Sequence, residues 1–132
     1  MEITWRAPIT SAEVNALHAE CFETRVFSDG ECDWKRLCEA HSLGWVSARR
    51  SSVLAGFVNV LWDGLTHAWI QDVMVSPAAR HAGVGTRLVA MAQEQARTAG
   101  CEWLHVDFDE HLAPFSLGAC GFTATPAGLI RL

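Results

Sequence analysis

Residues 72–88 of the chain read Asp72-Val-Met-Val-Ser-Pro-Ala-Ala-Arg-His-Ala-Gly-Val-Gly-Thr-Arg-Leu88. An apolar strand ends at Pro77, a glycine-containing turn follows, and an amphipathic helix begins directly after it. The first turn of a helix leaves four backbone N–H groups unpaired, and these donors suit a phosphate or pyrophosphate. Gly83 and Gly85 have no Cβ to hold a ligand away, and Arg80 adds a positive charge. The stretch therefore predicts a site for an anionic ligand.

Two other interpretations of this stretch stay open. One is a tight strand-to-helix turn that binds nothing. The other is a dinucleotide-binding fold, which requires a third glycine and an acidic residue about 20 positions further on. Glu102 is the best match for that acidic residue, but it is a poor first residue for a strand. The dinucleotide fold is therefore disfavoured.

Length and composition predict one globular domain spanning residues 1–132. A chain of 132 residues lies within the common domain size of about 100–150 residues. Half of the residues are hydrophobic and six are tryptophans, so a sizeable core can form. No run of about 18 apolar residues exists, and the N-terminal residues are not typical of a signal peptide. We expect a cytoplasmic protein.

The charge and the cysteines exclude several classes of protein. The net charge is −5, and the single lysine is Lys35, so no basic stripe for nucleic acid or for an anionic membrane is expected. The five cysteines are scattered and form no Cys-x-x-Cys pair. They indicate reduced, mostly buried thiols rather than a zinc site or a disulfide framework.

Hydrophobic periodicity and turn residues predict the order β, α, α, β, β, β, α, β, α, β. The predicted elements are a strand at 3–7, a helix from Thr10 or Ser11, a helix from Asp33 to about His41, strands at 45–50, 53–62 and 67–75, a helix at 83–99, a strand at 103–108, a helical or bent segment at 111–119, and one or two strands within 122–132. The predicted inward residues of the helices are Val14, Leu17, Cys21 and Phe22, then Trp34, Leu37 and Cys38, then Val84, Leu88, Met91, Ala92 and Ala96.

Two local motifs carry a family resemblance. Arg80-x-x-Gly83-x-Gly85, which follows a Val-x-Val-x-Pro strand, resembles the acetyl-CoA motif of the GNAT N-acetyltransferases. Leu117-Gly-Ala-Cys-Gly121-Phe122 resembles the Gly-Phe motif that closes the last helix of that family. The resemblance extends over nearly the whole chain, because the order of elements also matches. It implies an α/β acyl-CoA N-acyltransferase fold, with a central mixed, mostly antiparallel sheet flanked by helices.

The resemblance implies an enzyme that transfers an acetyl group from acetyl-CoA to a primary amine by direct attack. Acetyl-CoA is the cosubstrate, and no metal is expected. The pantetheine arm lies between two strands that splay apart after a bulge. Carried over to this chain, the backbone of Val73, Met74 and Val75 binds that arm. The pyrophosphate is bound by Arg80 and by the backbone N–H groups of His81, Ala82, Gly83, Val84, Gly85 and Thr86.

The acceptor amine must lose a proton before it attacks, because a lysine-type amine has a pKa of about 10.4. Strand alternation over 67–75 predicts that His67, Trp69 and Gln71 share a face with Val73 and Val75. Members of the family often place a base on that face, so His67 is a candidate base, although a surface histidine is the alternative interpretation. Asp72 is expected on the opposite face, where a structural hydrogen bond is the favoured role.

A second polar cluster reads His105-Val-Asp107-Phe-Asp109-Glu-His111. Histidine and carboxylate are plausible metal ligands, but no second such pair supports a metal. We expect a polar lining where this strand meets the acceptor pocket. Asp107 is a candidate base or a partner for a cationic amine, and His111 a candidate cofactor contact.

The sequence contains no tyrosine. The family usually has one before the Gly-Phe motif, where it protonates the departing CoA thiolate. Ser116 and Leu117 occupy this region, so Ser116 is the candidate replacement acid, with water or Cys120 as alternatives. A thiolate with a pKa near 8.5 can also leave without full protonation. Cys120 as a nucleophile is less favoured than a buried, packing role.

Two further functions stay open, and the substrate is not defined. One is an acyl-CoA-binding sensor that has lost efficient catalysis, which the absent tyrosine favours. The other is a nucleotide-binding domain that uses the same anion site. The expected partner is a small-molecule or peptide amine, and pairing of 122–132 across a homodimer interface is one arrangement that the resemblance allows.

Overall fold

The computed structural model describes all residues, 1–132. Its strands are β1 (Glu2–Trp5), β2 (Ser42–Arg50), β3 (Val53–Trp62), β4 (His67–Val75) and β5 (Trp103–Val106). Its α-helices are α1 (Ser11–Phe22), α2 (Trp34–His41) and α3 (Val84–Thr98). Three short turns of other helix types complete the fold: 3-10 turns at Pro77–Ala79 and Glu110–Leu112, and a π-helix at Pro114–Ala119.

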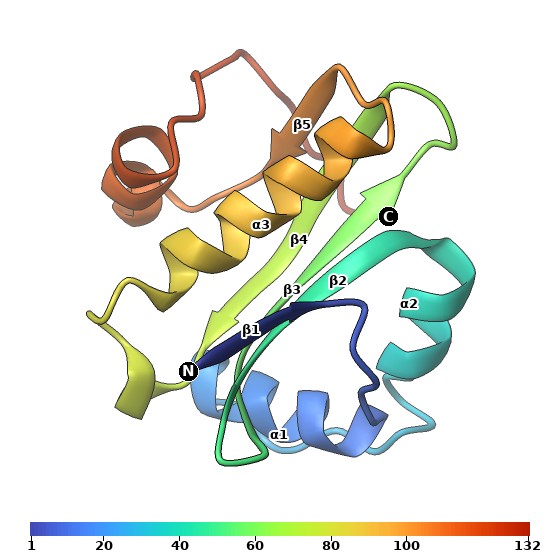
Figure 1. Cartoon of the computed structure of the whole chain (residues 1–132), viewed down its shortest axis with the longest axis vertical. Helices are drawn as coiled ribbons and strands as arrows, with labels where there is room; N and C mark the ends of the chain where they lie inside the picture. The colour runs from blue at the N-terminus through green and yellow to red at the C-terminus, as the bar shows by residue number, and fades with distance from the viewer.

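The five strands form one sheet in the order β1-β2-β3-β4-β5 (Figure 1). Every neighbouring pair is antiparallel except β4 and β5, which run parallel. The predicted mixed, mostly antiparallel sheet with flanking helices is therefore confirmed. The hairpin turns after Arg50 and Trp62 join the antiparallel strands, whereas the parallel pair requires the crossover through α3.

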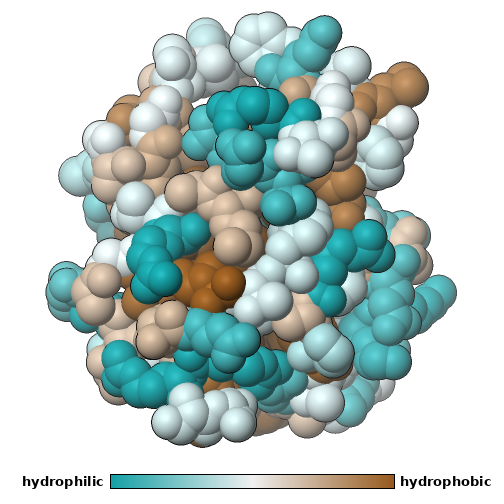
Figure 2. Space-filling view, viewed as in Figure 1, coloured by the Kyte–Doolittle hydropathy of each residue, from teal (hydrophilic) through white to brown (hydrophobic).

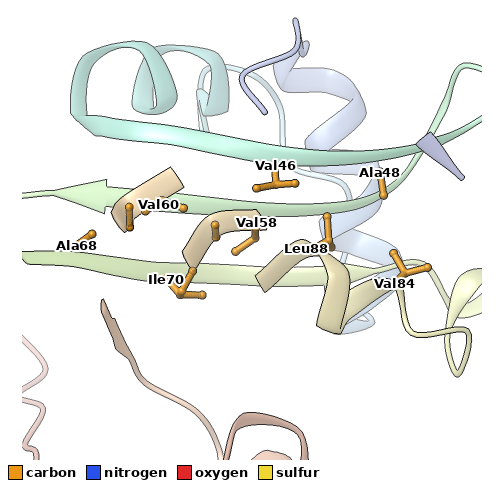
Figure 3. Packing of buried hydrophobic residues seen from close by; sticks show 10 residues of the cluster. Val46, Ala48, Val58, Val60, Ala68, Ile70, Val84 and Leu88 are labelled. Carbon is orange, nitrogen blue, oxygen red and sulfur yellow. The ribbon is translucent and has the colours of Figure 1, made fainter. Parts of the chain in front are cut away.

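Two apolar clusters hold helices against opposite faces of the sheet. The first packs α3 on β2, β3 and β4, and Figure 3 shows Val84 and Leu88 of α3 beside strand residues of this cluster. The second packs α1 and α2 on the other face, around Trp34 and Phe57. The predicted inward face of α3 is confirmed, because Val84, Leu88, Ala92 and Ala96 are buried and Met91 packs partly against them.

Both N-terminal helices begin where their capping residues predict. Thr10 and Glu13 form a capping box at the start of α1, and Asp33 accepts a hydrogen bond from the backbone N–H of Arg36 in α2. Arg49 in β2 binds both oxygens of Glu13, at 2.7 and 3.0 Å. The cap of α1 is thereby tied to the sheet.

A β-bulge in β4 changes which side chains face each side. Two β4 residues, Asp72 and Val73, lie opposite one residue of β3, and Asp72 has a left-handed φ of 57°. Val73 and Val75 consequently pack on the α3 side, the same side as Ile70. The predicted common face for His67, Trp69, Gln71, Val73 and Val75 is wrong, because strict alternation has no place for an extra residue.

Three other predictions differ from the structure. β5 ends at Val106 rather than at 108, and residues 122–132 form no strand. Phe22, predicted to face inward, is 48% exposed. The strand prediction for 122–132 relied on apolar residues, but Leu129 and Ile130 are almost fully exposed there, so no burial favours strand formation.

The surface seen from the α3 side is mixed in character. Hydrophilic side chains surround separate small apolar areas in Figure 2, without one large apolar patch on that face. None of the helices has an apolar stretch that could cross a bilayer.

Candidate active site

The candidate site begins where β4 and β5 separate. The two strands pair only over His67–Ile70 and Trp103–Val106, and β4 then continues alone to Val75. From Gln71 onward, the edge of β4 that faced β5 has no strand partner. Such an edge offers backbone donors and acceptors to an extended, amide-containing ligand. We refer to this opening between β4 and β5 as the fork.

The far end of this free edge is held by two side chains. The carbonyl oxygen of Val75 accepts hydrogen bonds from Arg80 Nε at 3.1 Å and from Cys21 Sγ at 3.2 Å. Burial raises the pKa of the Cys21 thiol, and the nearby Arg80 guanidinium acts in the opposite direction. Arg80 therefore lies between the fork and the turn that leads into α3.

The turn before α3 has the features of an anion site. His81 and Gly83 have left-handed φ values of 63° and 76°. The backbone N–H groups of His81, Ala82 and Gly83 donate no hydrogen bond, and no side chain caps α3. Successive free N–H groups at a helix N-terminus form a concave surface that attracts anions. The free N–H groups lie in the turn that the sequence singles out, and anion binding there stays a prediction.

Gly85 is closely packed by the protein itself, a contact that the sequence did not reveal. A Cβ at this position would lie 3.1 Å from the Phe115 ring and 3.6 Å from Val75 Cγ2. The side chain of Phe115, from the π-helix at 114–119, thus packs directly on the start of α3. The space at Gly85 is taken by the protein itself, whereas the space beside Gly83 is open to within 4 Å.

Asp72 lies at the fork, on the bulge of β4. Burial raises the pKa of its carboxyl, while the nearby His18 imidazole of α1 acts in the opposite direction. No hydrogen bond contributes to this pKa, so the structural hydrogen bond predicted for Asp72 is not present. A carboxyl with a raised pKa on a strained backbone is typical of a functional site.

His18 forms part of the wall that α1 contributes beside Asp72. Its ring lies 4.7 Å from the ring of Phe22, 5.6 Å from that of Phe27 and 6.1 Å from that of Trp34. His18 Nδ1 is buried and has no hydrogen-bond partner. Sequence reasoning missed His18 and favoured a structural role for Asp72. The available signal was the acidic residue directly before the apolar run Val73-Met74-Val75.

His67 lies at the closed end of the β4–β5 pair, away from the bulge. Five residues separate it from Asp72, which corresponds to about 16 Å of strand. Its Nδ1 lies 2.7 Å from Nε2 of His105 on β5. The structure thus brings together His67 and His105, and it places neither beside Val73. The role of His67 in catalysis stays a prediction.

Asp107 and Ser116 occupy different surroundings. Asp107 is exposed, one residue beyond the end of β5, at the mouth of the fork. Ser116 is 3% exposed within the π-helix, and its carbonyl accepts a hydrogen bond from the N–H of Phe122 at 3.0 Å. His111 is exposed in a 3-10 turn beyond the fork.

The cysteines and polar clusters assemble no metal or disulfide centre. All five cysteines are free, and no group of three or more His, Cys, Asp or Glu side chains is arranged to hold a metal ion. Burial raises the pKa of the Cys120 thiol, which lowers its thiolate fraction. This agrees better with a packing role for Cys120 than with a nucleophile.

Comparison with known proteins places this geometry in a family. The chain belongs to the acetyltransferase (GNAT) family, whose family model matches residues 8–122. No curated protein matches the sequence. Among solved structures, the chain is similar to the GNAT family protein SP0256 from Streptococcus pneumoniae TIGR4, with a TM-score of 0.79, 18% identity, and coverage of 99% of this chain and 96% of that one.

Two further similar structures are of acetyltransferases with named substrates. Aminoglycoside N-acetyltransferase AAC(6')-Iy in complex with CoA aligns with a TM-score of 0.75 and 18% identity, covering 99% of this chain and 93% of that one. Glucosamine-6-phosphate N-acetyltransferase from Arabidopsis thaliana aligns with a TM-score of 0.76 and 15% identity, covering 100% of this chain and 99% of that one. At such identities the likeness concerns the fold alone.

Proposed function

We propose that the protein transfers an acetyl group from acetyl-CoA to a primary amine by direct attack. The observation that carries this proposal is the continuity of the fork with the anion site. The free edge of β4 leads straight into unpaired amides at the N-terminus of α3. A cosubstrate with an amide-containing arm and a pyrophosphate matches both parts in order.

In this proposal the cosubstrate follows β4. The backbone of Val73, Met74 and Val75 pairs with the pantetheine arm, and Arg80 leaves the carbonyl of Val75 to meet the pyrophosphate. The N–H groups of residues 81–86 bind the phosphate oxygens. A backbone N–H near Val73 donates to the thioester oxygen as negative charge develops on it, an interaction often worth about 2.7–4 kcal/mol.

The reaction then has two bond changes and one proton transfer. The neutral amine attacks the thioester carbon, a C–N bond forms, and the C–S bond breaks to release the CoA thiolate. The amine proton must pass to a base. Asp72 is the group whose position supports this role best, since it lies at the fork and burial raises its pKa toward the working range of a general base. His67 and Asp107 remain the alternative bases.

The thiolate leaves near the π-helix in this proposal. Ser116 is the replacement acid that the sequence predicts, and its helix contacts the start of α3 through Phe115. A serine hydroxyl is a weak acid, so release of an unprotonated thiolate is the simpler route. We further propose that residues 1–132 act as a single cytoplasmic domain on a small amine, in keeping with the aminoglycoside and glucosamine phosphate named for its structural neighbours.

The test is calorimetric titration of acetyl-CoA into the wild-type protein and two matched variants. Ala82→Glu puts a negative charge into the anion site, whereas Ala90→Glu puts the same side chain on the exposed face of α3. We expect binding by the wild type and by Ala90→Glu, and at least tenfold weaker binding by Ala82→Glu. Equal binding by all three proteins would contradict the assigned cosubstrate site.

An acyl-CoA sensor is the second candidate function. The observation that favours it is the absence of tyrosine together with the burial of Ser116. Release of CoA thiol in the presence of primary amines distinguishes the two functions. Steady amine-dependent release supports the transferase, and tight binding without release supports the sensor.

A further inference from the structure

Four ring side chains gather on the sheet face opposite α3, at the paired end of β4 and β5. They are His67 and Trp69 of β4, and Trp103 and His105 of β5. Trp69 is 37% exposed and Trp103 is 62% exposed. Large aromatic side chains that are exposed together often mark an interaction site. We refer to these four residues as the ring cluster.

Three members of the ring cluster, His67, Trp69 and His105, stack on one another. His67 lies opposite Trp103 and Trp69 lies opposite His105 in the parallel register. The rings of His67 and His105 meet through their nitrogens at 2.7 Å, with planes only 26° apart. The Trp69 ring lies 4.9 Å from that of His105, at 16° to it. A surface ordered in this way loses little entropy when it binds a ligand.

No helix covers the ring cluster. The apolar cluster under α1 and α2 includes residues of β2, β3 and the end of β4, but none of β5. α1 packs on β3 and β4 and α2 on β2 and β3, and in Figure 1 both helices lie away from β5. Trp69, Trp103, His105 and Asp107 line a groove of about 920 Å³. Gln93, Ala96 and Arg97 of α3 and part of the C-terminal segment also line it, so the groove extends past β5 to the α3 side. This volume is in the range of small-molecule sites.

The ring cluster also has the right position relative to the fork. Trp69 precedes Gln71, the first β4 residue without a β5 partner, by two residues, or about 7 Å of strand. α3 and its apolar contacts fill the opposite face, whereas the exposed ring cluster leaves an open approach to the fork for an acceptor. Asp107 adds a carboxylate at the mouth of the fork, where it can attract an ammonium group.

We propose that the ring cluster binds the body of the acceptor, and that the acceptor is a primary amine joined by a short linker to a planar aromatic or heteroaromatic ring. The inference rests on the proposed function. The acceptor ring stacks on Trp69 and Trp103, while the amine extends along β4 to the fork. Stacking of aromatic rings adds about 2- to 12-fold in affinity beyond burial of area.

The first experiment measures binding without turnover. Tryptamine is titrated into the CoA-saturated protein while the indole N–H signals of the tryptophans are followed by NMR. Trp62 is the internal control, because it is 39% exposed but belongs to the α3-facing side, paired with the buried Ala68. We expect the indole N–H chemical shifts of Trp69 and Trp103 to change and to reach a plateau as tryptamine is added, and that of Trp62 to remain constant. Shifts confined to other residues, or none at millimolar tryptamine, overturn the proposal.

The second experiment measures kcat/KM for tryptamine and for hexylamine as an aliphatic control. Trp69→Ala is expected to lower the value for tryptamine 3- to 10-fold and to leave that for hexylamine nearly unchanged. Trp69→Phe should retain most of the activity with tryptamine, and Trp62→Ala all of it. Equal losses of kcat/KM for both amines in Trp69→Ala would contradict ring recognition, and so would equal kcat/KM values for the two amines in the wild type. Either result would leave the proposed transferase function intact. Absence of turnover with every amine counts against the transferase, and the NMR titration still decides whether the ring cluster binds.

Discussion

At the scale of single residues, Asp72 is the most informative, because its features cost stability and suit the proposed reaction. The side chain is partly buried without a hydrogen bond, and its backbone is left-handed. A residue that serves only the fold would not combine these features, because an ionised carboxylate is costly to bury. The neighbouring imidazole of His18 offsets only part of this cost.

Asp72→Asn is expected to raise the unfolding midpoint at pH 7 and to lower kcat/KM about 10²- to 10⁴-fold. Because burial raises the folded pKa of Asp72 above its unfolded value of about 3.8, the native state holds the proton more tightly. The stability that this carboxyl contributes is therefore full below pH 3.8 and declines as the pH rises through the folded pKa. Thermal unfolding across pH 3–8 and steady-state kinetics check both effects.

Asp107→Asn is the matched control for that experiment, since Asp107 is exposed beside the same fork. It should leave the unfolding midpoint unchanged across the same pH range. If Asp72→Asn retained full activity, Asp72 would not be the base, and His67 or Asp107 would take its place as the candidate.

Another residue-scale feature is the absence of space at Gly44. A Cβ there would overlap the ring of Trp5 in β1. Gly44→Ala is expected to lower the free energy of unfolding by about 1–3 kcal/mol, because the ring must move and β1 loosens. Gly30→Ala is the control, since its only neighbour within 4 Å is Ser28 Oγ, at 4.0 Å. Chemical denaturation measures both, and equal stability of the two variants would show that β1 tolerates the shift.

At the scale of elements, the N-terminus of α1 depends on a residue from β2. Arg49 binds the Glu13 carboxylate, and it also donates to the carbonyl oxygens of Ser52 and Pro8, at 3.0 and 3.2 Å. The hydrogen bonds from Arg49 hold the pKa of Glu13 below its usual value. The helix cap and the sheet are therefore stabilised together.

Glu13→Gln is expected to lower the free energy of unfolding at pH 7 by about 1–2 kcal/mol, through loss of charge-assisted hydrogen bonds. Since the folded pKa is lowered, the contribution of Glu13 is present above the unfolded pKa and is lost as the pH falls through the folded pKa. The variant and the wild type should thus converge in stability under acidic conditions. Urea unfolding at pH 7 and at pH 3 tests this, and a constant difference would contradict the ionic origin.

Elements with strong local signals were predictable from sequence, and those set by distant contacts were not. The capping residues Thr10 and Asp33 and the apolar face of α3 gave correct helices. The bulge at Asp72 was not visible, because it arises from how β4 pairs with β3 and not from the alternation within β4. The extra residue places Val73 and Val75 on the α3 side of the sheet. They therefore do not share a face with His67, contrary to the prediction from the sequence. The strand prediction for 122–132 was wrong for a related reason, because the apolar residues there have no surface to pack on.

At the scale of the whole molecule, the candidate site lies at the boundary between two cores. α3 is held on one face of the sheet and α1 with α2 on the other, and the fork opens between these packed layers. The anion site belongs to the α3 layer, whereas Asp72 faces His18 of the α1 layer. A ligand bound along β4 contacts both layers and should stabilise them together.

Acetyl-CoA is therefore expected to raise the thermal unfolding midpoint in a concentration-dependent manner. A ligand at 100 times its dissociation constant contributes about 2.7 kcal/mol to stability. ATP, which carries phosphates but no pantetheine arm, should give a smaller shift, and Arg80→Gln should reduce the shift from both. A larger effect of ATP than of acetyl-CoA would favour the nucleotide-binding alternative.

The bulge in β4 has a practical consequence for redesign. Before it, the side chains of His67, Trp69 and Gln71 lie on the face proposed for the acceptor, whereas the backbone after it, from Val73 to Val75, is the part proposed for the cosubstrate. One strand thus contains two adjoining stretches that can change independently. A library confined to positions 67, 69 and 71 should alter which amines are accepted while the thioester donor stays the same.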